Sequence, residues 1–147
     1  MNFSVEMKQT ATLAKKLIAR TQEGKIAWEA KPLIMMSAVT PDVFKSTRFV
    51  AFLENALSAT IIFEEKDKLA FISFLLIERV DADLMTAREK ELLSVRVDVD
   101  PPYGFDTAEQ KQLSKTLVEL YELARRSALK IDASVNKALE YLDKLAV

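Results

Sequence analysis

Apolar residues near the start of the chain recur every three or four positions, which is the spacing of one helical face. The set is Met7, Ala11, Leu13, Ala14, Leu17 and Ile18. Ser4 stands before it as a good N-cap residue, and Gly24 suits the position just past a helix end. The pattern predicts a helix over residues 4–23.

Five short segments downstream have strand character and are separated by turn signals. They are 25–29, 47–53, 57–64, 69–78 and 92–99. The connectors at 54–56 and 65–68 have hairpin length, which predicts antiparallel pairing. The charged stretch from Asp81 to Glu91 is expected to connect the last two strands.

The segment 69–78 is apolar on both of its faces. Antiparallel sheets usually leave one face wet, so this strand is predicted to be central and covered on both sides. The fifth strand alternates apolar and polar residues, which places it nearer an edge. The segment from Leu33 to Phe44 has no clear period and is the candidate cover for the second face, as a flap, a core cover or a dimer contact.

The last third of the chain is predicted to be helical, with Asp106 as N-cap and Glu109 completing a capping box. A break is expected near residues 130–132, with Asp132 as a second N-cap. Two apolar stripes result: Leu113, Leu117, Leu120, Tyr121, Ala124 and Ala128, then Val135, Leu139 and Leu142. The predicted fold is a single α+β domain over 1–147. It has an N-terminal helix, an antiparallel meander of about five strands, and one long or broken C-terminal helix packed on the sheet.

Composition excludes several function classes. The chain has 147 residues, 21 basic against 22 acidic side chains, 2 glycines, and neither cysteine nor histidine. Near-neutral charge disfavours nucleic acid as a partner, and the missing thiol and imidazole exclude the commonest catalytic arrangements. Without a Gly-rich phosphate cradle, no cofactor is expected.

The N-terminus has no signal-peptide pattern, and the longest apolar run, 69–77, is about half the roughly 20 residues of a membrane span. The expectation is a cytoplasmic protein that does not enter a membrane.

Carboxylates are the remaining candidates for metal or acid–base chemistry. Asp98, Asp100 and Asp106 surround the Pro-Pro turn, and hard cations such as Mg²⁺ take oxygen ligands. The favoured alternative is structural: Asp98 on the solvent face, Asp100 at the strand end and Asp106 as a helix cap. Arg125 and Arg126 form a basic pair on the last predicted helix. A solvated helix face is favoured for this pair over a contact with an acidic partner or phosphate.

A ligand or partner surface is predicted from Trp28, Met35, Met36, Phe44 and Phe74. Trp28, the sole tryptophan, suits the floor of a pocket, although packing beneath the first helix is the commoner role. Met35 and Met36 are adaptable apolar side chains of the kind found at accommodating binding surfaces.

Two stretches resemble segments of short uncharacterised bacterial proteins of mobile elements, of the prophage or integron-cassette type. They are LIARTQEGKIAWE at 17–29 and LVELYELARR at 117–126. The resemblance implies an accessory or interaction role. The leading hypothesis is a non-enzymatic binding or interaction protein, with a homodimer as one expected assembly. The alternatives are a small-ligand-binding protein or carboxylate-metal-dependent enzyme, and an antitoxin or immunity-type inhibitor.

Overall fold

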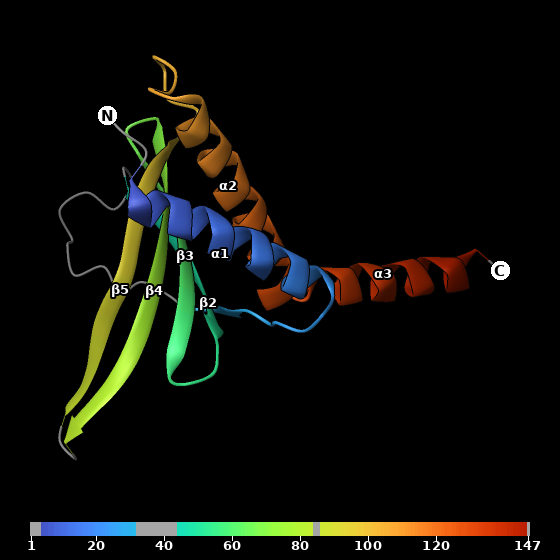
Figure 1. The fold of residues 1–147 in the computed structure, drawn as a ribbon. Coiled ribbons are helices and arrows are strands. Elements are labelled where there is room, and N and C mark those ends of the chain that lie inside the picture. Colours follow the sequence, from blue (N-terminus) through green and yellow to red (C-terminus); the bar gives the residue numbers. More distant parts are fainter. Residues whose placement is uncertain (1–3, 32–43, 84–85, 147) are drawn as a thin grey trace.

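The computed structural model describes residues 4–31, 44–83 and 86–146. Its elements are α1 (Val5–Gln22), β1 (Glu29–Ala30), β2 (Phe44–Phe52), β3 (Leu57–Lys66), β4 (Leu69–Asp83), β5 (Thr86–Val99), α2 (Ala108–Ala128) and α3 (Ile131–Leu145). The strands form one antiparallel sheet in the order β1-β2-β3-β4-β5 (Figure 1). The predicted α+β class, with an N-terminal helix and a meander, is confirmed.

Helix α1 begins and ends as the sequence predicts. The Ser4 hydroxyl accepts a hydrogen bond from the Met7 N–H at 3.2 Å. At the other end Gly24 has φ +74°, its N–H bonds Thr21 O, and the Lys25 N–H reaches back to Arg20 O. This pair of bonds is a Schellman motif, which satisfies the last carbonyls of the helix.

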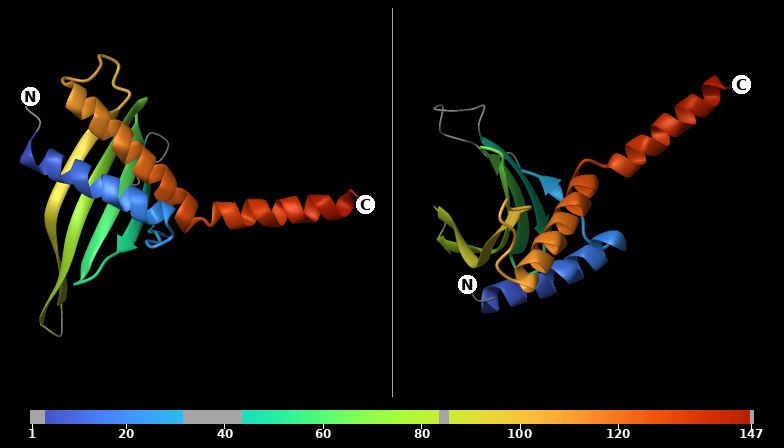
Figure 2. Two further views of the ribbon diagram at one scale, coloured as in Figure 1. Left: turned by 45° about the vertical axis from the view of Figure 1, so that its right-hand side comes forward. Right: turned by 90° about the horizontal axis from the view of Figure 1, so that it is seen from above.

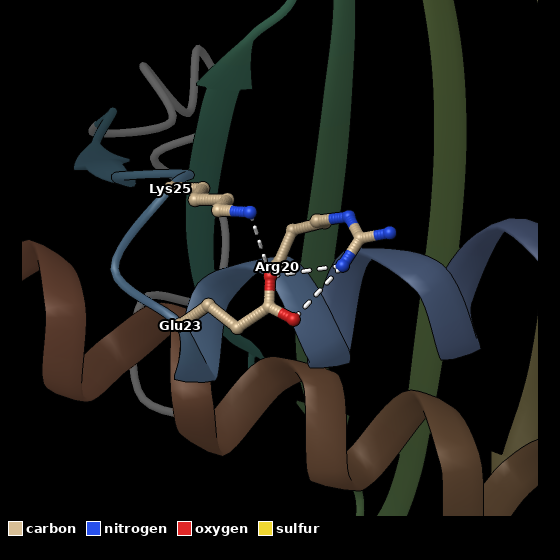
Figure 3. Close-up of polar contacts among 3 residues, drawn as sticks. All are labelled: Arg20, Glu23 and Lys25. Atoms are coloured by element: carbon tan, nitrogen blue, oxygen red, sulfur yellow. Dashed lines mark hydrogen bonds and ion pairs between the residues drawn. The ribbon is translucent and has the colours of Figure 1, made fainter.

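Three charged side chains, Arg20, Glu23 and Lys25, lie at the same end of α1 (Figure 3). The Glu23 carboxylate lies 2.9 Å from Arg20 Nη1 and 3.6 Å from Lys25 Nζ. All three side chains are at least 43% exposed, so water screens these ion pairs and each contributes little to stability. They are surface features and not a buried network.

The predicted hairpins are confirmed, and each closes through two residues in the left-handed region. Asn55 and Ala56 both have φ +61°, and Asp67 and Lys68 have φ +52° and +67°. Two successive positive φ values define a type I′ turn, whose twist matches the strands on either side. The turns therefore fix the register from β2 through β4.

The charged stretch predicted as a connector is instead strand, which corrects that expectation. β4 continues to Asp83 and β5 begins at Thr86, and the two pair as a ribbon beyond the end of β3, where Leu57 pairs with Glu78. Past that point no third strand among the described residues flanks the ribbon. The side chains of Arg79, Val80, Glu89 and Lys90 on this ribbon are exposed, which suits the charged residues among them. β5 is an edge strand, as predicted.

The first strand is shorter and later than the predicted 25–29. Only Glu29 and Ala30 pair with β2. The backbone N–H of Trp28 donates to the Ser127 hydroxyl at 3.1 Å and not to a neighbouring strand. At Trp28, attachment to α2 therefore replaces sheet pairing.

The hydrophobic core lies between the sheet and two helices. α1 and α2 lie on the same face of the sheet, which is strongly curved (Figure 2). The strand residues that face them have no exposed surface at Ala51, Ala59, Ile61, Ile72 and Phe74. From α2, the first predicted stripe supplies Leu113, Leu117, Leu120 and Ala124 to the same core. Burial of this stripe explains why α2 packs on the sheet.

The N-cap of α2 is Thr107 and not the predicted Asp106. The Thr107 hydroxyl accepts a hydrogen bond from the Gln110 N–H at 3.1 Å, and its backbone is extended. The sequence fits a capping box in both registers, since Glu109 follows Asp106 and Gln110 follows Thr107 at the same spacing. The local pattern alone does not choose between them.

Replacing each candidate cap by alanine tests this assignment. Thr107→Ala is expected to lower the free energy of unfolding by about 1 kcal/mol, because the Gln110 N–H loses its partner. Asp106→Ala is expected to stay within about 0.5 kcal/mol of the unmodified protein. Urea denaturation followed by circular dichroism measures both. If Asp106→Ala lowered the free energy of unfolding more than Thr107→Ala, Asp106 would be the N-cap, as the sequence predicted.

The predicted break separates α2 from α3. Lys130 has φ +52° and ψ +44°, a left-handed conformation that ends α2, and its side chain makes no capping bond. Asp132, predicted as the N-cap, lies in the first turn of α3 and pairs with Arg126. From the break, α3 extends away from the sheet (Figure 2). Only the first part of the broken C-terminal helix packs on the core.

Candidate functional site

Two of the residues predicted as a ligand or partner surface, Trp28 and Phe74, are not exposed. Trp28 is 3% exposed and Phe74 is fully buried, and both belong to the core on the helix-covered side. Phe44 is the first residue of β2. Met35 and Met36 lie outside the described residues.

Trp28 is held by polar contacts as well as by packing. Its indole Nε1–H donates to the Thr21 hydroxyl at 3.0 Å, in addition to the backbone bond to Ser127. A buried tryptophan normally finds a partner for its N–H, and here α1 and α2 supply one partner each. The geometry is that of a core residue that ties the two helices together.

The three aspartates surround one loop but do not assemble a metal site. Within residues 4–31, 44–83 and 86–146, no three acidic side chains are grouped closely enough to hold a metal ion. Asp98 and Asp106 line one pocket of about 340 Å³, whereas Asp100 and Asp106 line another. The Arg96 guanidinium, which also lines the first pocket, stacks 4.0 Å from the Phe71 ring centroid.

The arginine pair on α2 is engaged locally. Arg125 pairs with Glu122 at 3.3 Å, and Arg126 pairs with Asp132 across the helix break. The partners are half or more exposed, so this region matches the predicted solvated helix face.

The second face of the sheet, opposite the helices, is the first surface of interest. Thr60 is 2% exposed, Val50 8% and Ser73 9%, while Phe71, Leu75 and Ile77 are half-buried. No helix of the described chain lies on this face. Residues 33–43 of the predicted cover lie outside the described residues, so that expectation stays a prediction.

A pocket of about 480 Å³ opens on this second face. Its charged lining is Lys31, Arg48, Arg79 and Glu89. Its remaining walls come from Val50, Phe52, Leu53, Ala56, Leu57, Ser58, Thr60 and Ile77. We call this site the basic pocket. It collects three positive charges and one negative charge from a chain whose total is −1.

Helix α3 is the second surface of interest. None of its residues is buried. Four large apolar residues on one side of the helix are between 47% and 63% exposed: Val135, Leu139, Leu142 and Leu145. We call this set the α3 stripe. It is an apolar surface that nothing in the described chain covers.

Sequence reasoning identified the apolar residues of α3 but not the basic pocket. The spacing of Val135, Leu139 and Leu142 predicted an amphipathic helix but assigned its apolar face to the sheet. The positive φ of Lys130 directs α3 away from the sheet, and no residue type marks that turn. The basic pocket was missed because Lys31, Arg48 and Arg79 are far apart in sequence.

No family model, curated protein or solved structure matches the chain. No relative therefore supplies a fold name or a functional residue. Across the described ranges, no helix is both long and apolar enough to cross a membrane.

Proposed function

We propose that the protein is a non-enzymatic interaction protein that self-associates, and that a second copy of the chain covers the α3 stripe. The observation that carries the proposal is the stripe itself, whose four large apolar side chains are each about half exposed or more. Such a patch presents apolar area on the order of 400 Å², which is the size of the largest apolar patch on a typical monomer, a patch that is often functional.

The stability of α3 supports a bound state. The helix has 15 residues and buries none of them. Isolated helices of about 12–15 residues are marginal in water, because most helical stability in proteins comes from packing an amphipathic face. A partner that buries the stripe would supply the missing free energy.

The spacing of the stripe favours another helix as that partner. Val135, Leu139 and Leu142 are separated by four and then three residues, the alternation that places side chains on a coiled-coil seam. Ala146 continues the seam with a small side chain. A helix of this length spans about 22 Å, enough for knobs-into-holes packing over roughly two heptads.

The charges on α3 permit an identical helix to be the partner. Asp132, Glu140 and Asp143 are offset in part by Lys137 and Lys144, which leaves one net negative charge on each helix. Because the helix carries both signs, two copies repel each other only weakly. Pairing two stripes, together with the exposed Leu129 beside the break, would bury on the order of 1,000 Å² in total, near the lower limit for a specific interface.

Light scattering coupled to size-exclusion chromatography tests the proposal. At 100 µM the unmodified protein is expected to have twice the chain mass of 16.6 kDa. Leu139→Asp is expected to weaken the dimer at least about 100-fold, because it places a charge in the seam. Its unfolding transition in dilute solution should not change, since Leu139 is 54% exposed in the single chain.

Ala133→Asp is the matched control. It introduces the same charge into α3, on the face opposite the stripe, and is expected to leave the dimer intact. A monomer at 100 µM for the unmodified protein would refute the proposal. So would a dimer that Leu139→Asp and Ala133→Asp affect equally.

A further inference from the structure

We propose that the basic pocket binds a small organic anion with an apolar body, a carboxylate or phosphate joined to a short hydrocarbon. This site is separate from the α3 stripe and does not depend on self-association. Its volume of about 480 Å³ falls within the range of small-molecule sites.

The charge of the pocket determines the sign of the ligand. Among the described residues that line it, Lys31, Arg48 and Arg79 outnumber the single acidic residue, Glu89. Among the ion pairs of the described chain, none involves Lys31, Arg48 or Arg79. These ion pairs therefore do not neutralise the three positive charges. Glu89 lies opposite Arg79 in the register of β4 with β5, so the described lining keeps a net positive charge.

Arg48 provides the most specific indication of a ligand. Its Nε atom is buried and has no hydrogen-bond partner among the residues that the structure describes, although buried donors are almost always paired. Arg48 lies on β2 opposite Ile62, with its side chain on the face that carries the pocket. A carboxylate or phosphate would satisfy this fork of donors, since arginine binds such groups with two parallel hydrogen bonds.

Lys31 is held at the pocket by two contacts. Its backbone N–H donates to Arg48 O at 3.0 Å, which extends the pairing of β1 with β2 by one residue. Its ammonium lies 5.7 Å from the centroid of the Phe52 ring, within the range of a cation–π contact. Lys31 and Arg48 therefore lie on adjacent segments that line the same pocket.

The apolar walls of the pocket indicate that the ligand also has a hydrocarbon body. Val50, Leu57 and Ile77 line the pocket beside the charged groups, and Phe52 is 63% exposed at its margin. A ligand with a hydrocarbon body would cover these side chains while its anionic end meets Arg48. Inorganic phosphate alone would leave them exposed to water, so it is expected to bind more weakly.

Calorimetric titration of the full chain with octanoate, octyl phosphate, octylammonium and inorganic phosphate tests the site. We expect both octyl anions to bind, octylammonium to show no binding, and inorganic phosphate to bind at least tenfold more weakly. Arg48→Met, which keeps length and removes charge, is expected to weaken octanoate at least tenfold. Arg20→Met, an exposed arginine on α1, should have no effect. Equal binding of octanoate and octylammonium, or no binding of either anion, would overturn the proposal.

The stability of the Arg48 variant gives an independent readout. Without ligand, Arg48→Met is expected to raise the thermal midpoint, because it removes a buried donor for which the described chain supplies no partner. A purely structural arginine would give a lower midpoint. A fall in the midpoint with octanoate affinity unchanged would contradict the assignment. Repeating the titration in Leu139→Asp separates this result from the oligomeric state.

Discussion

Phe74→Ala is expected to lower the free energy of unfolding by about 3–5 kcal/mol, because it leaves a large cavity in a close-packed core. Phe74 has no exposed surface and lies in β4 opposite Ile61 on one side and Val95 on the other. Both neighbours are also buried beneath the helices. With total stabilities commonly about 5–15 kcal/mol, such a loss would remove a large share of the fold's margin.

Tyr103→Ala is the matched control for the aromatic-to-alanine change. Tyr103 is 100% exposed, so its removal is expected to change stability by less than about 0.5 kcal/mol. Urea denaturation at one fixed protein concentration compares the two variants. Similar losses for both would show that Phe74 does not lie in the core.

Trp28→Ala has the second largest expected effect, also about 3–5 kcal/mol of unfolding free energy. The substitution removes a side chain that is 3% exposed and also removes the indole donor to Thr21. Since Trp28 bonds α1 through its ring and α2 through its backbone, the loss should loosen both helices. Circular dichroism during urea unfolding measures it without using tryptophan emission.

Trp28→Phe separates packing from hydrogen bonding. It retains an aromatic ring and loses the bond to Thr21, so the expected loss is about 1 kcal/mol.

In the unmodified protein, tryptophan emission should stay constant as octanoate is added, because the ring lies on the helix side of the sheet. A change in emission on binding would instead support the prediction that Trp28 belongs to the ligand surface.

The fold was largely predictable because its signals are local. The spacing in α1, its Ser4 cap and Gly24 each act within one or two turns of chain. The two hairpins follow from connectors too short for any other arrangement. One prediction was wrong because Asp106 and Thr107 fit the N-cap pattern equally well. Another was wrong because a charged stretch such as 81–91 is compatible both with a loop and with a two-stranded ribbon outside the core.

The candidate sites were less predictable because they depend on long-range placement. Trp28 and Phe74 were correctly recognised as large apolar residues, but the face on which they lie depends on where α1 and α2 pack. Arg48 has an ordinary sequence context. What singles it out is its buried Nε, which lacks a hydrogen-bond partner within the described ranges. The residues of its pocket come from Lys31 to Glu89 and meet only through the strand register.

By itself the sequence determined the helix–meander–helix order, the lack of cysteine and histidine side chains in these 147 residues, and the break near residue 130. These properties are either compositional or local, and periodicity, caps and turns specify them directly. The tertiary structure decided which sheet face the helices cover, which residues line the basic pocket, and that the α3 stripe faces solvent. Each of these depends on the packing of segments distant in sequence, and a one-dimensional pattern of apolar residues does not specify which surface an apolar face meets.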